Sequence, residues 1–298
     1  MILAATDLIP FIHPTPIVEM IKSRVKGSLL YAKLEFLNPY SQSIKDRAAI
    51  FMIRETLKKR PSKIYEASSG NFAIALTLLS NAYGIPVRIY LPKNAPESTK
   101  KLLRLLGAQV IKTDFESITP EMVEIVKREA EKDGAINLNQ FESELNPLAH
   151  YLGTGEELVK QLREGGVKPT HIVLTIGTTG TLWGIAKRVR EVEEWEGIKL
   201  IGVQPAVGSK IPGIKRIESR PKWLKLANPD LIIDVTEEEA AQGVIEIARK
   251  EGLAVGMSSG AAYVAYKKIA ETEEGVFVTV FPDSIYKYIE MIEKLVEV

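Results

Sequence analysis

The sequence contains no cysteine and only three histidines in 298 residues. The absence of cysteine excludes disulfides, thiolate–metal sites and a cysteine nucleophile. The histidines, His13, His150 and His171, are far apart in the chain and form no ligand-spaced pair. The sequence therefore predicts no metal site and gives little support to a Ser-His-Asp triad. For His150 and His171, ordinary packing is the expected role.

Long apolar runs and an excess of one charge are also missing. No apolar run approaches the roughly 18 residues that a membrane-spanning helix needs. The formal net charge of +1 gives no reason to expect nucleic acid or an anionic membrane as a partner. The segment Met1–Pro10 lacks the basic and apolar regions of a signal peptide. These features predict a soluble, cytoplasmic protein.

The overall composition is that of a globular protein, with 45% hydrophobic and 26% charged residues. A chain of this length accommodates one large domain or two of medium size. Glutamate outnumbers aspartate, and asparagine and glutamine are scarce, which hints at a thermophilic, heat-adapted protein.

The chain alternates between strand-like and helix-like segments, joined by turns that contain glycine or serine. Strands are expected at Lys63–Ser68, Pro86–Leu91, Gln109–Thr113, His171–Ile176, Lys199–Val203 and Val276–Phe281. Helices are expected at Asp46–Leu57, Asn71–Tyr83, Glu97–Leu106, Pro120–Lys132, Asn146–Leu162, Thr181–Glu194 and Glu237–Glu251. This alternation predicts an α/β fold with mostly parallel sheets. A domain boundary is expected near Gln140–Pro147, and Pro205–Asp230 is the longest segment without clear periodicity.

Two polar turns precede predicted helices in the first half of the chain. In the first, Asn38–Arg47, Lys45 stands at the positive helix end, which favours the neutral amine that Schiff-base chemistry needs. A lysine in this setting is more often only part of a solvated helix start. The second, Ser68-Ser69-Gly70-Asn71, offers hydroxyls and free amides that suit a carboxylate, while Asn71 suits a ring hydroxyl. A simple helix cap is the alternative for this turn.

Two further turns follow in the second half of the chain. The turn Gly177-Thr178-Thr179-Gly180-Thr181 suits a dianionic phosphate, although a plain Gly/Thr turn is equally compatible with it. It lacks the spacing of a P-loop or of GxGxxG, which disfavours ATP and NAD. In Gly256–Ala262, Ser258 places a hydroxyl where a ring nitrogen could meet it.

Taken together and in this order, the four turns resemble the fold-type II family of pyridoxal-phosphate (PLP) enzymes. This family includes cysteine synthases, cystathionine β-synthase, serine and threonine dehydratases, and threonine synthase. The resemblance extends from Pro14 to Ser284. Within the family, Asn139-Gln140-Phe141 is similar to a stretch of cysteine synthases that borders the substrate, and Gly208–Arg216 resembles cysteine synthase B more than cysteine synthase A.

The resemblance implies a tryptophan synthase β-like fold: two three-layer α/β/α domains with mostly parallel sheets and with PLP in the cleft between them. A smaller, mobile domain would comprise residues 36–146. A larger cofactor-binding domain would comprise residues 1–35 and 147–298. Family members are usually homodimers, so a homodimer is expected as well.

The resemblance also implies a role for each residue of the four turns. Lys45 would carry PLP and then remove the α-proton of the substrate, and Asn71 would bind the cofactor's ring oxygen. The phosphate would lie against Gly177, Thr178, Thr179, Gly180 and Thr181, and the pyridine nitrogen against Ser258. Substrate contacts would come from Ser68, Ser69, Asn71, Phe72, Gln140 and Arg216.

The expected reaction makes L-cysteine from O-phosphoserine or O-acetylserine and sulfide, through an aminoacrylate intermediate in two half-reactions. A neutral serine at the pyridine nitrogen makes the ring a weaker electron sink than an aspartate would, which suits loss of a β-substituent. The forked donors of Arg216 favour a phosphate leaving group, although a surface cation is the alternative.

Two departures from the family pattern keep other interpretations open. Phe72 stands where cysteine synthases usually have threonine, and Thr179 stands where the phosphate loop usually has glycine, so a positive φ at Thr179 would be strained. The alternatives are a PLP-dependent dehydratase or racemase, a β-replacement enzyme with another nucleophile, and a catalytically silent PLP-fold protein.

Overall fold

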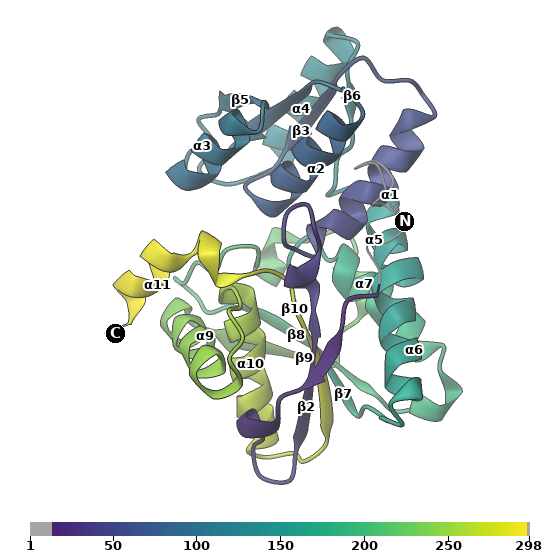
Figure 1. Ribbon diagram of the computed structural model, residues 1–298, viewed down its shortest axis with the longest axis vertical. Coiled ribbons are helices and arrows are strands. Elements are labelled where there is room, and N and C mark those ends of the chain that lie inside the picture. Colours follow the sequence, from purple (N-terminus) through teal and green to yellow (C-terminus); the bar gives the residue numbers. More distant parts are fainter. Residues whose placement is uncertain (1–13, 297–298) are drawn as a thin grey trace, which may run out of the picture. The chain divides into compact units, whose positions relative to one another are not determined.

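The computed structural model describes residues 14–296, which form two compact units (Figure 1). One unit contains residues 38–146, and the other contains residues 14–37 and 147–296. The domain assignment predicted for residues 1–13, and with it His13, lies outside the described residues.

The first unit is built on a sheet of four parallel strands in the order β5-β4-β3-β6. The strands are β3 Ile64–Ala67, β4 Val87–Leu91, β5 Gln109–Lys112 and β6 Ile136–Asn137. The helices are α1 Lys45–Leu57, α2 Asn71–Ala82, α3 Glu97–Leu105 and α4 Pro120–Lys132. Because successive strand residues face opposite sides, Ile64 packs with α1 and α2, whereas its neighbour Tyr65 packs with α4. The sheet is thus the middle of three layers.

The second unit has a sheet of six strands in the order β1-β2-β10-β7-β8-β9. The strands are β1 Ile17–Glu19, β2 Leu29–Leu34, β7 His171–Thr175, β8 Lys199–Pro205, β9 Leu231–Val235 and β10 Val276–Phe281. Only the pairing of β1 with β2 is antiparallel. The central strand β10 is almost wholly apolar, as expected for a parallel strand covered on both faces.

Helices cover both faces of this second sheet, with α9 and α10 on one side and α6 and α7 on the other (Figure 1). The α-helices of this unit are α6 Glu156–Glu164, α7 Gly180–Arg190, α8 Leu224–Ala227, α9 Glu237–Glu251, α10 Met257–Ala270 and α11 Ile289–Leu295. The short helix α5, Leu145–Ala149, lies where the chain passes from one unit to the other. Single 3-10 turns occur at Ile21–Ser23, Glu35–Leu37, Glu193–Trp195, Ile217–Ser219 and Ile285–Lys287. The predicted α/β class with mostly parallel sheets is confirmed.

One predicted helix is interrupted in the structure, and several elements, among them β2 and β9, were not predicted. The segment predicted as a single helix, Asn146–Leu162, consists of α5, a π-helical turn at His150–Gly155 and α6. Helix α7 approaches this turn at Gly184, where an added Cβ would lie 2.5 Å from the carbonyl oxygen of Pro147. Turns of the π type are rare and are often found at functional sites.

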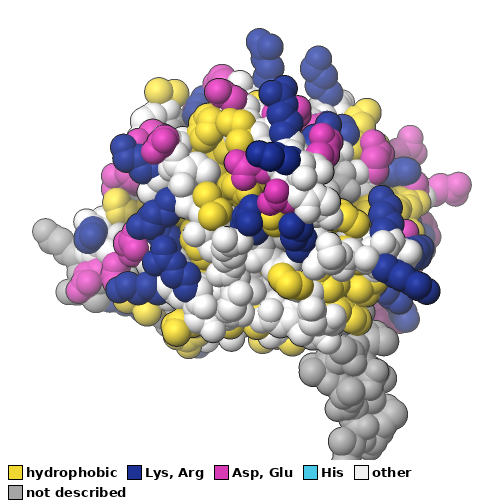
Figure 2. Space-filling model, turned by 90° about the horizontal axis from the view of Figure 1, so that it is seen from above, with side chains coloured by type: hydrophobic (Ala, Val, Ile, Leu, Met, Phe, Trp, Pro, Cys, Tyr) yellow, Lys and Arg dark blue, Asp and Glu magenta, His cyan; other side chains and the backbone are white. Residues whose placement is uncertain are grey.

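Side chains of both charges share the surface of the protein (Figure 2). Lysine and arginine side chains lie among aspartate and glutamate side chains on the face drawn in Figure 2. Within residues 14–296, no helix is both long and apolar enough to cross a bilayer.

Candidate functional site

Lys45 is the first residue of α1 and is partly buried. The turn before it is held by Asp46, whose carboxylate accepts the backbone N–H groups of Tyr40 (2.8 Å) and Ser41 (2.9 Å) and the Ser41 hydroxyl. The backbone N–H of Lys45 itself donates to Ser43 Oγ at 3.2 Å. A carboxylate that satisfies these amides fixes the turn against the helix start. Lys45 is therefore presented from a rigid position.

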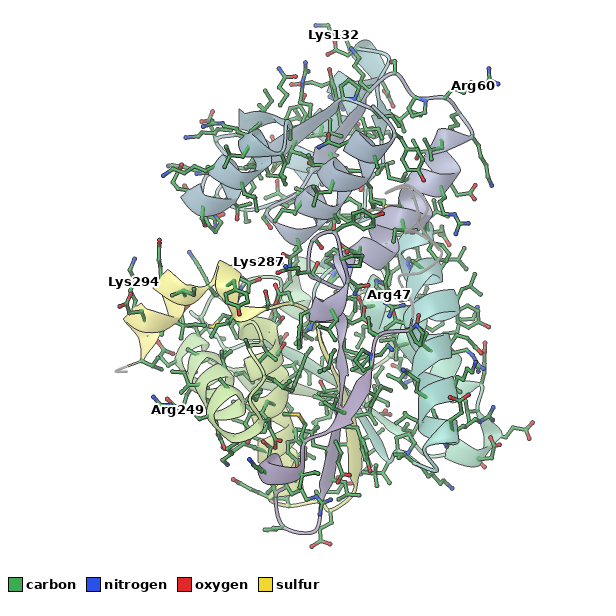
Figure 3. The ribbon with its side chains drawn as sticks, viewed as in Figure 1. Arg47, Arg60, Lys132, Arg249, Lys287 and Lys294 are labelled. Carbon is green, nitrogen blue, oxygen red and sulfur yellow. The ribbon has the colours of Figure 1, made fainter. Side chains whose placement is uncertain are left out.

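The two charged residues that follow Lys45 at the start of α1 are buried, whereas a charged residue beyond the end of α1 is exposed. Asp46 is fully buried, and Arg47, labelled in Figure 3, is 1% exposed. Arg60, three residues beyond the end of α1, is exposed and points away from the ribbon (Figure 3). A merely solvated helix start does not bury its first charged residues, so this arrangement argues against that alternative for the Lys45 turn.

The turn from β3 to α2 carries Ser68, Ser69 and Gly70, and α2 begins at Asn71. Ser68 is 2% exposed, and its hydroxyl accepts the backbone N–H of Ala73 at 3.1 Å, so it acts as a helix cap. Ser69, by contrast, is exposed, and an added Cβ on Gly70 would meet no atom within 4 Å. The turn thus combines a capping role with open space beside its hydroxyl and amide groups.

Gln140 lies against this same turn within the first unit. Its side-chain amide donates to the carbonyl oxygen of Ala67 at 3.4 Å, directly before Ser68. Asn146 Nδ2 donates to the Gln140 carbonyl oxygen at 2.8 Å. Residues that are about seventy positions apart in sequence are thereby brought together.

Beneath Gln140, the carboxyl group of Glu66 is fully buried. It accepts the backbone N–H groups of Asn139 (2.8 Å) and Gln140 (3.3 Å). Burial raises the pKa of Glu66 to about 8, although the hydrogen bonds from Gln140 and Asn139 act in the opposite direction. Nothing in the local sequence distinguishes this glutamate from an ordinary strand residue, so its role could not be predicted.

Phe72 is 2% exposed and belongs to the hydrophobic core of the first unit. Its ring packs among residues of α1, α2 and the sheet, and this burial accounts for an apolar residue at the position. The prediction that Phe72 borders the substrate stays a prediction.

In the second unit, the turn Gly177–Thr181 leads from β7 into α7, which begins at Gly180. Thr179 has φ +67°, so this position does require the left-handed conformation that is costly for a β-branched residue. Its hydroxyl compensates by donating to the Thr178 carbonyl oxygen (2.6 Å) and by accepting the backbone N–H of Trp223 (3.1 Å). The turn is thereby attached to the irregular segment that Trp223 belongs to.

The π-helical turn supplies a buried partner for the Gly177–Thr181 turn. His150 is fully buried; its Nε2 lies 3.1 Å from Thr181 Oγ1 and its Nδ1 lies 2.9 Å from Thr154 Oγ1. A histidine held by two hydroxyls fixes the direction of both. His150 therefore does more than pack, and its contact with Thr181 had no signal in the local sequence.

Ser258 is the second residue of α10 and is 7% exposed. The helix is fixed at Gly256, whose backbone N–H donates to the Asp283 carbonyl oxygen at 2.8 Å. An added Cβ on Gly256 would lie 2.1 Å from Asp283 Oδ1, so only glycine fits there. Backbone contact with the chain after β10 thus sets where Ser258 stands.

Arg216 makes several contacts with protein groups. Its guanidinium donates to both carboxylate oxygens of Glu218 (2.9 and 3.1 Å), to Asp234 (3.2 Å) and to a backbone carbonyl oxygen. The carboxylates of Glu218 and Asp234 raise the pKa of Arg216. A leaving phosphate would have to compete with these two acids. Beside it, burial lowers the pKa of the Lys215 ammonium group.

The structure therefore groups the predicted site residues in two sets. Lys45, the turn Ser68–Phe72 and Gln140 belong to the first unit, and Gly177–Thr181, Ser258 and Arg216 belong to the second. Among the described residues, no cluster of three or more histidine or acidic side chains could hold a metal ion.

Two similar proteins match nearly the whole chain. The chain is 33% identical over 271 residues to cysteine synthase B of Salmonella typhimurium, covering 89% of this chain and 88% of that protein. It is 33% identical over 302 residues to an O-acetylserine dependent cystathionine beta-synthase of Bacillus subtilis, covering 95% of this chain and 96% of the relative.

Solved structures of similar proteins also cover nearly the whole chain. The crystal structure of an O-ureido-L-serine synthase superposes with a TM-score of 0.89 at 25% identity and covers 97% of this chain and 95% of its own. That of the O-acetylserine dependent cystathionine beta-synthase from Helicobacter pylori has a TM-score of 0.83 at 30% identity, with 97% and 98% coverage. The model of the family described as pyridoxal-phosphate dependent enzyme matches residues 8–283. The chain therefore belongs to the pyridoxal-phosphate dependent enzyme family.

Proposed function

We propose that this protein is a PLP-dependent cysteine synthase that makes L-cysteine from O-acetylserine or O-phosphoserine and sulfide. The observation that carries the proposal is a lysine held at the first position of a helix, in a chain whose relatives over most of its length are named cysteine synthases. A nucleophilic amine fixed in this way suits Schiff-base chemistry.

Each of the two sets contains donor groups of a kind that PLP needs. The cofactor needs an amine for its aldehyde and donors for its dianionic phosphate, and it supplies a ring that accepts electrons from the substrate's α-carbon. Lys45 is the proposed amine. The start of α7, with its backbone amides and the hydroxyls of Thr178 and Thr181, is the proposed phosphate site.

Asn71 and Ser258 are proposed to orient the ring, through its oxygen and its pyridine nitrogen respectively. Both are neutral and both stand at the start of a helix, α2 and α10. Ser258 offers a hydroxyl and no negative charge to the ring nitrogen. A neutral partner does not stabilise a protonated ring, and this favours expulsion of a β-substituent over extensive charge delocalisation in the ring.

The substrate carboxylate is proposed to bind at Ser68, Ser69 and Gln140. The hydroxyl of the exposed Ser69 and the backbone amides at the α2 start are the donors best suited to it. Ser68 contributes mainly by capping α2, and the Gln140 amide lies beside the same turn. Lys45, once released from the cofactor, would take the α-proton.

β-Replacement with a nucleophile other than sulfide is the second candidate function. The similar proteins named cystathionine beta-synthase and O-ureido-L-serine synthase favour it, because their names denote different products on the same fold. The homodimer, the cytoplasmic location and the heat adaptation expected from the sequence belong to this proposal as further expectations.

Titration of the PLP-loaded protein with O-acetylserine or O-phosphoserine tests the proposed function. We expect the visible band of the lysine-bound cofactor to shift with a donor and to return when sulfide is added, with release of L-cysteine. A donor-induced shift that reverses only with another thiol or an amine would favour the second candidate. Formation of keto acid alone would identify a dehydratase, and the absence of any band after addition of PLP would contradict the proposal.

Replacement of Thr181 tests the proposed phosphate site. Thr181→Val removes the hydroxyl that His150 orients while keeping the side-chain shape, and Thr181→Ser is the matched control. Because a hydrogen bond to a charged group contributes about 1.5–3 kcal/mol, PLP should bind about tenfold to a hundredfold more weakly to the valine variant. Equilibrium dialysis against PLP measures this. Equal affinity in the valine and serine variants would exclude Thr181 from the phosphate site.

The leaving group can be assigned with Arg216→Ala. If Arg216 binds the phosphate of O-phosphoserine, kcat/KM for that donor should fall while kcat/KM for O-acetylserine stays unchanged. Glu218→Gln is the control, because it removes a competing carboxylate and should increase phosphoserine activity. A similar effect of Arg216→Ala on both donors would mean that the arginine serves only its contacts with Glu218 and Asp234.

A further inference from the structure

The buried carboxyl group of Glu66 lies where the hydrogen-bond ladder between β3 and β6 ends. The two strands pair through Ile64 with Ile136 and through Tyr65 with Asn137, and β6 extends no further. Asn139 then adopts φ +48°, which turns the chain out of the strand conformation. The backbone amides after β6 therefore have no strand to donate to, and each needs another acceptor.

Glu66, the next residue of β3, supplies that acceptor with its side chain. Its Oε2 accepts the N–H of Asn139 at 2.8 Å and the side-chain amide of Asn137 at 3.5 Å, and its Oε1 accepts the N–H of Gln140 at 3.3 Å. The Asn137 amide also donates to the carbonyl oxygen of Tyr65 at 2.9 Å. The carboxyl group of Glu66 thus accepts, from the turn at residues 138–140, the hydrogen bonds that a neighbouring strand would otherwise accept.

The same turn determines where the side chain of Gln140 lies. Gln140 is 4% exposed, and its amide donates to Ala67, the last residue of β3 before the Ser68–Asn71 turn. Glu66 and Ala67 are neighbours on one strand, so the backbone of Gln140 and its side chain are held by consecutive residues of β3. If the turn at residues 138–140 moved, the Gln140 amide would lose its position beside Ser68.

We propose that Glu66 is a positioning residue that holds the turn at residues 138–140, and thereby Gln140, in the geometry that binds the carboxylate of the amino-acid substrate. This inference rests on the proposed function, because it assigns Gln140 and the Ser68–Asn71 turn to that carboxylate. Burial of Glu66 without its amide donors would be unfavourable, as the upward shift of its pKa by desolvation indicates. The carboxyl group and the turn therefore stabilise each other.

Glu66→Gln tests the proposal with little change of volume. At a pH above about 8, where the Glu66 carboxyl group is ionised, the amide places an N–H among N–H donors and removes one of the two acceptors. Amide hydrogen exchange at residues 139 and 140 should then accelerate at least about tenfold. Thr77→Val is the matched control: Thr77 is a buried residue of the same unit whose hydroxyl donates to the Ala73 carbonyl oxygen at 2.7 Å. The control should leave exchange at residues 139 and 140 unchanged even if it lowers stability. Unchanged exchange at these residues in Glu66→Gln would overturn the proposal whether or not the protein makes cysteine.

Binding provides the second measurement. In the PLP-loaded protein, Glu66→Gln should raise the dissociation constant of O-acetyl-L-serine, followed by the cofactor's absorption, about tenfold, while PLP affinity and the band without substrate stay as in the unmodified protein. A fall in kcat with unchanged substrate affinity would instead indicate an acid–base role for Glu66 and would contradict a positioning role. If the unmodified protein binds no amino acid, the proposed function fails, and hydrogen exchange still decides the role of Glu66.

A double-mutant cycle with Gln140→Ala separates positioning from general destabilisation. If Glu66 acts through Gln140, adding Glu66→Gln to Gln140→Ala should weaken O-acetyl-L-serine binding by less than about twofold. Should the glutamine variant fail to fold, Asn137→Ala is the substitute. It removes one donor to Glu66 and the hydrogen bond to the Tyr65 carbonyl oxygen. It should therefore accelerate amide exchange at residues 139 and 140 and raise the dissociation constant of O-acetyl-L-serine. Additive effects in the cycle would contradict the proposal.

Discussion

The passage from the carboxyl end of a parallel strand to the amino end of a helix is the constraint on which the candidate site depends. In such a passage the amides of the first helical turn have no partner in the helix, and the next strand cannot satisfy them either. The turns before α2 and α7 follow this pattern, and each carries hydroxyl-bearing residues at the helix start. Helix α10 instead follows helix α9 and a short loop, and it too begins with serines. A fold of this class therefore presents ligand-binding donors at the carboxyl ends of its strands before any catalytic group is added.

Buried polar side chains hold these turns in place, and they are not the residues expected to touch a ligand. Asp46 satisfies the turn before Lys45, Glu66 satisfies the turn that contains Gln140, and His150 orients Thr181. Burying a carboxyl group or an imidazole is unfavourable unless hydrogen bonds replace its water. The backbone amides and hydroxyls of the turns provide those bonds, so the support residues and the turns are stable only together.

Local sequence predicted the elements whose ends carry their own signals. Helix Pro120–Lys132 has the expected limits because Thr119 caps it and proline stands at its first turn, and Glu237–Glu251 begins with the capping box of Thr236 and Glu239. Strand β10, which is almost wholly apolar, also has the predicted ends. By contrast, β2, β9 and the π-helical turn went unrecognised, because the pairing of β2 with β10 and the approach of Gly184 join distant parts of the chain. The roles of Glu66 and His150 depend on such distant contacts and leave no local pattern.

At Thr179 the sequence indicated a possible backbone strain but not the contact that offsets it. The sequence indicated that threonine would be strained there if the turn required the left-handed conformation, and the structure shows that it does. What the sequence could not indicate is the compensation, a hydrogen bond from the backbone N–H of Trp223, 44 positions away. The effect of a residue that departs from a family pattern therefore depends on the residues that it contacts in the folded chain.

Borohydride reduction of the PLP-loaded protein, followed by sequencing of its peptides by mass spectrometry, identifies the lysine that carries PLP. We expect a phosphopyridoxyl group on the peptide that contains Lys45, on that lysine alone, and none in Lys45→Ala. A modified lysine elsewhere in the chain, or an unmodified Lys45 in a protein that retains bound PLP, would contradict this expectation.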